Sequence, residues 1–324
     1  LLINVGIAML VLVGAYQVNA GSAKVGAIIS STSYMTMILN ALMMVSRLFA
    51  IYTRGAASAK RIAEVLDAPD DMPLSPRDHE DTEYHLAFRD VRFSYDGVQD
   101  NLAGVSFALR RGQTLGVIGP TGSGKSTLIS LLMRLYDVGS GEIRISGDNV
   151  AGIPPAELHT MFGVAFQNDF LFADTIRENI DLGRGLSDEA IERAARAAQA
   201  DFIWDNEAGM EYDLAVKGAN LSGGQKQRLL IARALAGNPQ VLILDDSSSA
   251  LDYRTDAKLR RALREEYAQV TTVIVAQRVS SLLHADAILV LDEGEAIGYG
   301  THEQLMATCD SYRELYEVQM GEVA

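Results

Sequence analysis

The sequence predicts an α/β domain preceded by an all-α fragment. An apolar strand, a glycine-rich loop and a helical pattern follow one another between Thr114 and Met133. Short apolar runs of strand type alternate with helical stretches beyond residue 84, and two long uncharged runs occupy the first 46 residues. With 324 residues, 48% of them hydrophobic, the chain can form one large domain and a smaller one.

Charge and cysteine usage narrow the class of protein. The net charge of −14 at pH 7 argues against a nucleic-acid partner, because phosphate backbones attract basic surfaces. Cys309 is the only cysteine in these residues, so they contain no internal disulfide, and this usage fits a reducing compartment. We interpret Cys309 as an ordinary residue rather than a nucleophile.

Two uncharged runs predict membrane-spanning helices. The first, Leu1–Ala23, opens without an initiator methionine or the basic start of a signal peptide, so we expect the sequence to be the later part of a longer protein. The second, Val25–Ser46, extends about 33 Å as a helix, against about 30 Å for the hydrocarbon core of a bilayer. A buried hairpin of a soluble protein is the alternative interpretation.

Charge placement predicts the orientation of these helices. Four basic residues follow the second run: Arg47, Arg54, Lys60 and Arg61. The positive-inside tendency places this end in the cytoplasm and the turn over residues 19–24 outside, in an integral protein of the plasma membrane. Within the second run one helix face carries Ser33, Thr36, Asn40 and Met43. This face can serve helix packing, which we favour, or line a substrate path.

The helical pattern continues to Leu66 and breaks at Asp67-Ala68-Pro69. Residues 70–84 are acidic and contain prolines, which is typical of a solvated linker. We therefore predict a helical membrane fragment over residues 1–66, a linker over residues 67–84 and an α/β domain over residues 85–324.

The glycine-rich loop has the residues of a phosphate-binding loop. Its glycines let backbone N–H groups turn toward an anion, and the next helix adds its free N–H groups and the positive end of its dipole. Lys125 is positioned to reach the β- and γ-phosphates of a nucleotide, and Ser126 to hold Mg²⁺. The predicted nucleotide-binding residues here are Gly119, Pro120, Thr121, Gly122, Ser123, Gly124, Lys125, Ser126 and Thr127.

Three further stretches suit the same chemistry. Tyr95 follows a strand and can stack on an adenine, with core packing as the alternative. Gln167 ends the apolar run 163–167, where its amide can ligate Mg²⁺ or position water, with an ordinary surface glutamine as the alternative. The apolar run 241–244 leads into Asp245 and Asp246, which predicts a buried parallel strand that presents carboxylates to a metal at its end.

A second helix start offers another anion contact. The sequence Leu221-Ser222-Gly223-Gly224-Gln225 precedes a strongly helical run over residues 226–236. Its hydroxyl and glycines lie where helix N–H groups are free. We predict that Ser222, Gly223, Gly224 and Gln225 contact a nucleotide phosphate.

These motifs together make the sequence similar to the C-terminal part of an ATP-binding-cassette (ABC) exporter half. LSGGQ at Leu221–Gln225 resembles the signature of that family, and it lies between a Walker A loop and a Walker B strand, where it is most specific. The resemblance covers essentially all 324 residues. It implies the last two transmembrane helices followed by the whole nucleotide-binding domain, that is, an α/β nucleotide-binding domain (P-loop ABC ATPase) preceded by an all-α transmembrane fragment.

The resemblance also implies residue roles. It makes Tyr95 the aromatic residue that stacks on adenine, Gln167 the Q-loop residue and Asp245 the Walker B ligand of Mg²⁺. The D-loop corresponds to residues 249–252. The implied ligands of Mg²⁺ are Ser126, Gln167 and Asp245, and the implied catalytic residues are Asp246, Gln277 and Gln167.

Two catalytic positions depart from the family pattern. Asp246 occupies the position of the usual glutamate that polarises the attacking water, and its carboxylate sits about 1.5 Å further back. Gln277 occupies the position of the usual switch histidine, and a neutral amide cannot carry the charge of an imidazolium. We predict a weakened hydrolytic site, because a misplacement of about 1 Å can reduce the rate on the order of 10²-fold.

In this family two nucleotide domains pair head to tail around ATP and Mg²⁺. The resemblance therefore implies a second exporter half as partner, with Glu and His at the matching positions, in a lipid bilayer that a small molecule, lipid or peptide crosses. A homodimer with two slow sites is one alternative. A nucleotide-gated regulatory or structural membrane protein with little hydrolysis is another. A DNA-repair or chromosome-organising ATPase shares such a signature, but the apolar runs and the acidic charge argue against it.

Overall fold

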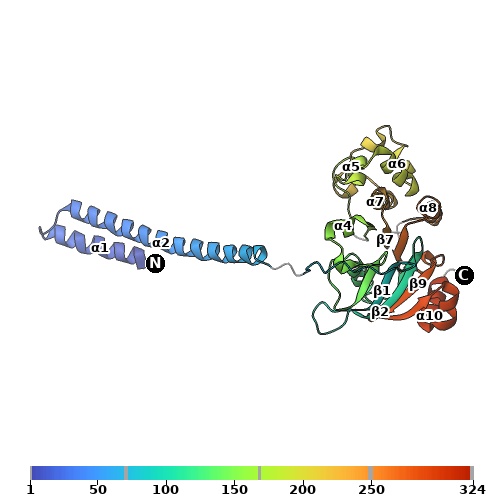
Figure 1. Ribbon diagram of the computed structural model, residues 1–324. Helices are drawn as coiled ribbons and strands as arrows, with labels where there is room; N and C mark the ends of the chain where they lie inside the picture. The colour runs from blue at the N-terminus through green and yellow to red at the C-terminus, as the bar shows by residue number, and fades with distance from the viewer. Residues whose placement is uncertain (1, 69–71, 167–168, 247–250, 322–324) are drawn as a thin grey trace. The chain divides into compact units, whose positions relative to one another are not determined.

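The computed structural model describes residues 2–68, 72–166, 169–246 and 251–321. The chain divides into two compact units, Leu1–Asp71 and Met72–Ala324. The first unit is a helical hairpin and the second is an α/β domain (Figure 1). This is the fold class that the sequence predicts.

The first unit consists of α1 (Leu2–Asn19) and α2 (Val25–Leu66), which lie side by side in antiparallel directions (Figure 1). Two glycines of α1 allow close approach of the helices. A Cβ at Gly6 would lie 2.7 Å from Met35 Cε, and a Cβ at Gly14 would lie 2.8 Å from Ile28 Cγ1. Small residues serve this purpose between membrane helices, where close backbone approach supplies van der Waals contact.

Only one of the two predicted spans reaches full length. Among the described residues α2 is the one helix that is long and apolar enough to cross a membrane, by length and composition, and α1 contributes a shorter apolar helix over Asn4–Asn19. The polar face of α2 with Ser33, Thr36 and Asn40 is exposed and does not pack on α1. Packing within this hairpin therefore does not account for that face.

In the second unit the larger sheet has the strand order β10-β9-β3-β8-β7-β6. Its pairs are parallel except that β10 runs antiparallel to β9. The strands are β3 (Thr114–Ile118), β6 (Phe162–Ala165), β7 (Val241–Asp245), β8 (Thr271–Val275), β9 (Ala287–Asp292) and β10 (Glu295–Gly300). A smaller antiparallel sheet has the order β2-β1-β4-β5. Its strands are β1 (Tyr84–Phe93), β2 (Leu102–Arg110), β4 (Ser140–Ile145) and β5 (Asp148–Asn149).

The helices of the second unit cover the larger sheet, and α5, α6 and α7 form a helical layer beyond β7 (Figure 1). Their bounds are α3 (Lys125–Leu132), α4 (Pro155–Thr160), α5 (Ile176–Asp181), α6 (Asp188–Ala197), α7 (Gly223–Ala236), α8 (Tyr253–Glu266), α9 (His302–Thr308) and α10 (Asp310–Gly321).

Strand β7 explains why the larger sheet is buried on both faces. Val241 and Ile243 pack in the core that holds α3 and the smaller sheet. Leu242 and Leu244 pack in the core formed by α5, α6 and α7. Successive side chains of a strand point to opposite faces, so a continuous apolar run supplies two cores at once. The carboxylate-bearing end of β7 is thereby fixed from both sides.

The segment before β1 differs from its prediction. The sequence predicts a solvated linker over residues 67–84, whereas residues 72–83 lie along the α/β domain. Arg77 Nη2 donates to Asp148 Oδ2 at 2.6 Å, and the Ser75 N–H donates to the Ala151 carbonyl oxygen at 2.9 Å. Arg77, Asp78 and His79 find partners about seventy positions away along the chain, which composition cannot reveal.

Candidate nucleotide-binding site

The phosphate-loop prediction corresponds to a strand, a loop and a helix at the centre of the larger sheet. β3 lies between β9 and β8, and its carboxyl end leads through residues 119–124 into α3. The backbone is left-handed at Gly122 (φ +87°) and Gly124 (φ +101°). A Cβ at Gly119 would overlap the Leu291 carbonyl oxygen. Side chains are therefore excluded, which leaves backbone N–H groups free to face an anion.

The start of α3 is open to such an anion. Gly124 is its N-cap residue, and no side chain among the described residues caps it. The first N–H groups of this eight-residue helix thus have no intrahelical partner, and they add to the positive end of the helix dipole.

Lys125 is held by the loop it follows. Its Nζ donates to the carbonyl oxygens of Gly119 at 2.8 Å and Pro120 at 2.7 Å. Burial lowers the pKa of Lys125, while the charges of Asp245 and Asp246 act in the opposite direction. The ammonium therefore lies in the field of both carboxylates, in the pocket that it shares with them.

One pocket of the second unit brings the predicted motifs together. It encloses about 1180 Å³ of empty space, including its open mouth. The carboxyl ends of parallel strands meet there, where open α/β sheets bind their ligands. The predicted site residues that line it are Gly119, Pro120, Thr121, Gly122, Lys125, Ser126, Asp245, Asp246 and Gln277.

The two carboxylates differ in their backbone. Asp245 is the last residue of β7, and burial raises its pKa, with a further contribution from the charge of Asp246. Asp246 follows in the left-handed region at φ +49°, and its N–H donates to the Val275 carbonyl oxygen at 2.8 Å. Burial also raises the pKa of Asp246. Aspartate tolerates this conformation better than most residues that carry a Cβ.

Asp246 and Gln277, the two residues that depart from the family pattern, are joined by a hydrogen bond. Gln277 Nε2 donates to Asp246 Oδ2 at 3.1 Å. This hydrogen bond occupies one oxygen of the Asp246 carboxylate.

Helix α10 supports this arrangement, which no sequence pattern indicates. The side chain of Gln319 donates to the Gln277 carbonyl oxygen at 2.9 Å and accepts from the Val279 N–H at 2.8 Å. Its amide thus clamps the backbone on both sides of Arg278. A lone glutamine on an amphipathic helix carries no pattern that identifies this contact.

Tyr95 is exposed beside the loop. The residue is 52% exposed, and its ring lies edge-on to Phe93 at 4.8 Å and to Tyr136 at 5.1 Å between centroids. The Tyr95 N–H donates to Asn101 Oδ1, while the Asn101 carbonyl oxygen would lie 2.7 Å from a Cβ at Gly124. Asn101 thereby connects the aromatic residue to the loop, which suits a stacking role.

The signature residues lie elsewhere, at the start of α7. Ser222 is the N-cap, and a capping box joins its hydroxyl to the Gln225 N–H and the Gln225 side chain to the Ser222 N–H. A Cβ at Gly223 would meet no atom within 4 Å. None of the residues from Ser222 to Gln225 is among the described residues that line the pocket.

Some predicted residues do not line the pocket or fall outside the description. The side chains of Ser123 and Thr127 are buried below the loop. Gln167 lies outside the described residues, as do Ser249 and Ala250 of the predicted D-loop.

The donor set suits a magnesium ion that arrives with a nucleotide. Ser126 and Asp245 both line the pocket and offer oxygen ligands. The described residues contain no cluster of three or more His, Cys, Asp or Glu side chains that could hold a metal alone. Mg²⁺ commonly takes one or two protein ligands together with phosphate oxygens and water, so these residues fit it.

The fold and this pocket define a P-loop nucleotide-binding domain. Residues 102–249 match the family described as ABC transporter. The chain therefore carries an ABC transporter ATP-binding domain, and it has an ABC exporter fold in which a helical fragment precedes that domain.

Known proteins support this assignment. The chain is 39% identical over 324 residues to "Uncharacterized ABC transporter ATP-binding protein YfiB" of Bacillus subtilis, covering 99% of the chain and 56% of that protein. It is 39% identical to "Probable multidrug resistance ABC transporter ATP-binding/permease protein YheI" of the same organism, covering 94% of the chain and 53% of that protein. The solved "Structure of a bacterial Atm1-family ABC exporter with ATP bound" matches with a TM-score of 0.76 and 31% identity, over 98% of the chain and 56% of the exporter chain. The chain spans about half the length of these relatives.

Proposed function

We propose that this chain is the ATP-binding part of an exporter half, which couples MgATP binding and hydrolysis to efflux of a substrate across the membrane. The observation that carries the proposal is the single pocket shared by the phosphate loop, the end of β7 and Gln277. The two helices of the first unit supply the connection to a membrane domain.

The residues of the pocket, together with Tyr95 outside its lining, each bind a different part of MgATP. The loop N–H groups and Lys125 bind the β- and γ-phosphates, and the ring of Tyr95 stacks on the adenine. Ser126 and Asp245 hold Mg²⁺, which when bound neutralises the charge of the phosphate oxygens. Closure of two such domains around ATP favours the outward-open membrane helices, and hydrolysis restores the inward-open state.

The site built on this chain is proposed to hydrolyse ATP slowly. The shorter side chain of Asp246 holds its carboxylate back from the water, and the hydrogen bond from Gln277 engages one of its oxygens. Gln277 cannot supply a positive charge to the γ-phosphate. Both effects act on the transition state, so binding of MgATP is retained while turnover falls.

The signature of this chain is proposed to serve the partner's site. A capping box closes the start of α7, and among the described residues the space around Gly223 is open for a phosphate held by a second exporter half. Donors fixed in this way stabilise charge that develops during phosphoryl transfer. The pair is therefore asymmetric, with a partner that carries Glu and His at the positions of Asp246 and Gln277.

Steady-state ATPase rates of the assembled pair test this division. Gly223→Asp places a carboxylate where the partner's γ-phosphate approaches, and we expect it to remove most of the activity. Because a Cβ there meets no atom of the described residues within 4 Å and an acidic residue suits a helix start, we expect the substitution to leave the fold intact. Asp246→Asn, the matched change in the chain's own site, should reduce the rate only modestly. The opposite ranking refutes the asymmetric pair.

The hydrogen bond from Gln277 to Asp246 also favours a second candidate function. A site with Asp246 engaged by Gln277 also suits a nucleotide-gated regulatory membrane protein that binds ATP without turnover. Transport into vesicles measured beside ATPase activity separates the two, because only an exporter accumulates substrate in proportion to the ATP consumed. One relative is named "Fatty acid ABC transporter ATP-binding/permease protein" of Mycobacterium bovis, so a fatty acid is a reasonable first substrate to test.

A further inference from the structure

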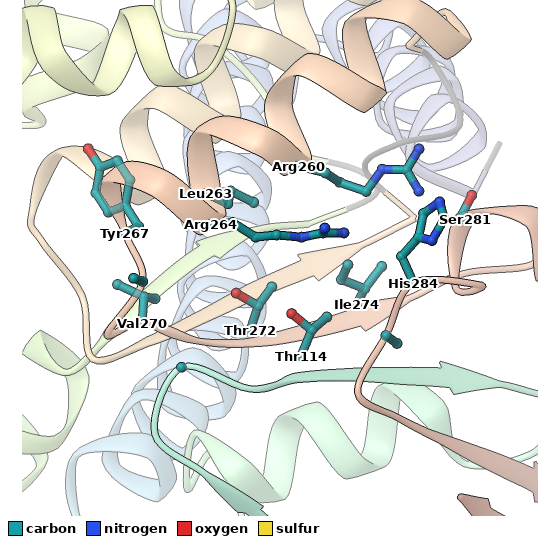
Figure 2. Close-up of a pocket in the computed structure, with 13 residues that line it drawn as sticks. Thr114, Arg260, Leu263, Arg264, Tyr267, Val270, Thr272, Ile274, Ser281 and His284 are labelled. Atoms are coloured by element: carbon teal, nitrogen blue, oxygen red, sulfur yellow. The ribbon is translucent and has the colours of Figure 1, made fainter. Parts of the chain in front are cut away.

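A second pocket lies under α8, apart from the nucleotide site (Figure 2). Its floor is formed by β3 and β8, through Thr114, Thr272 and Ile274, and its far wall by the loop that carries His284. It encloses about 650 Å³ of empty space, including its open mouth. It shares no lining residue with the nucleotide pocket among the described residues.

The inner basic group of this pocket is Arg260. Its Nη2 pairs with Asp256 Oδ2 at 2.9 Å, and its side chain is only 14% exposed. Its Nη1 is buried and has no hydrogen-bond partner among the described residues. A buried guanidinium N–H without an acceptor is unfavourable, so this group requires an acceptor that the described residues do not provide.

A second guanidinium and an imidazole complete the basic side of the pocket. Arg264 comes from the next turn of α8, and within the described part of the chain it forms no hydrogen bond or ion pair. Figure 2 shows its guanidinium extending above Thr272 and Ile274 toward the side where Arg260 and His284 lie. Helical spacing of four residues places both arginines on one face of α8.

Neighbouring acids do not cancel this charge. Asp256 is already paired with Arg260, and Asp286, which follows the lining residue Ala285, accepts the Thr114 N–H at 2.7 Å. Among the residues that the structure describes, Arg264 therefore has no counter-ion, although the net charge of the chain is −14. An excess of positive charge in a hollow of an acidic protein selects anions.

We propose that this pocket binds a phosphate-type oxyanion, either inorganic phosphate or a phosphate monoester. Guanidinium groups match phosphate oxygens in two-point hydrogen bonds, and the buried Nη1 of Arg260 supplies one such donor. The hydroxyls of Thr114 and Thr272 and the ring of His284 add further donors. Together they exceed what the two oxygens of a carboxylate can accept, whereas phosphate has enough oxygens for all of them.

The bound oxyanion bridges two elements that lead from the nucleotide site. α8 begins eight residues after Asp245, and His284 lies seven residues after Gln277. The proposal concerns a binding site and does not depend on whether this chain hydrolyses ATP.

Calorimetric titration of the intact protein in lipid nanodiscs tests the proposal, with the nucleotide site filled by a non-hydrolysable MgATP analogue. Inorganic phosphate is the first titrant, glycerol 3-phosphate the second and acetate the third. We expect the dissociation constant for phosphate to rise at least about tenfold in Arg264→Gln, since a charged hydrogen bond is lost. Lys258→Gln, an exposed residue of α8 that does not line the pocket, is the matched control and should change it less than about twofold.

A second variant guards against misfolding. Arg260→Lys keeps the pairing with Asp256 but removes the buried Nη1, and it should weaken phosphate binding without changing the melting temperature. Tighter binding of glycerol 3-phosphate identifies a monoester as the ligand, and tighter binding of phosphate identifies the free ion. Equal affinity of the wild type and Arg264→Gln, or acetate binding as tightly as phosphate, overturns the proposal.

Discussion

Restoring the family pattern at two positions is expected to activate the site of this chain. In the double variant Asp246→Glu, Gln277→His, the longer side chain advances the carboxylate by about 1.5 Å, the length of one C–C bond. The histidine removes the amide that donates to Asp246 Oδ2 and introduces a ring that can carry positive charge toward the γ-phosphate.

The size of the effect follows from this geometry. A misplacement of about 1 Å changes a rate on the order of 10²-fold, and a well-placed general base contributes about 10²–10⁴-fold. The substitution at position 246 also lowers the folding stability. The backbone at Asp246 is left-handed with φ +49°, and glutamate accepts this region less readily than aspartate, by roughly 1 kcal/mol of folding stability. We therefore expect turnover at this site to rise about 10- to 100-fold, with a slightly lower melting temperature.

Vanadate trapping of labelled nucleotide, resolved by subunit in the assembled pair, measures turnover at each site separately. The single variants Asp246→Glu and Gln277→His show how much of the increase in turnover each position contributes. Gln269→His adds a histidine at an exposed glutamine outside the pocket and controls for the histidine alone. If the unmodified site already turns over as fast as the partner's site, or if the double variant gains nothing, the weakened-site reasoning is wrong.

Two other predictions concern topology and pH. A cysteine at Gly21 should react with an impermeant reagent outside intact cells, and a cysteine at Ala57 should react only after lysis. The reason is that the basic residues follow the second span. Equal protection of both cysteines indicates a soluble hairpin. Burial lowers the pKa of His85 to about 4, so the folded α/β domain holds it neutral while the unfolded chain protonates near pH 6.5. Stability should be full above pH 6.5 and fall by up to about 2–3 kcal/mol toward pH 4. Denaturation followed by Trp204 fluorescence should show this slope in His159→Gln, whose histidine is exposed, and lose it in His85→Gln; an unchanged slope in His85→Gln contradicts the assignment.

Much of the nucleotide site was predictable because its chemistry is local. The strand, the glycines and Lys125 occur within a dozen positions, and each depends on the backbone of its neighbours. The left-handed glycines and the uncapped start of α3 have the conformations that this pattern requires. The order of apolar and acidic residues at the end of β7 likewise predicts a buried strand that ends in carboxylates.

What the sequence determined by itself, therefore, is the fold class, the phosphate loop and the residue types at the catalytic positions. The tertiary structure decided which of them meet. The parallel register pairs Asp245 with Val275, so the residues that follow, Asp246 and Gln277, come within hydrogen-bond distance although 31 positions separate them. The contacts of Gln319, the docking of segment 72–83 and the pocket under α8 likewise bring together residues that are distant in the sequence. Such contacts depend on how strands align and helices pack, and no periodicity within one segment encodes them.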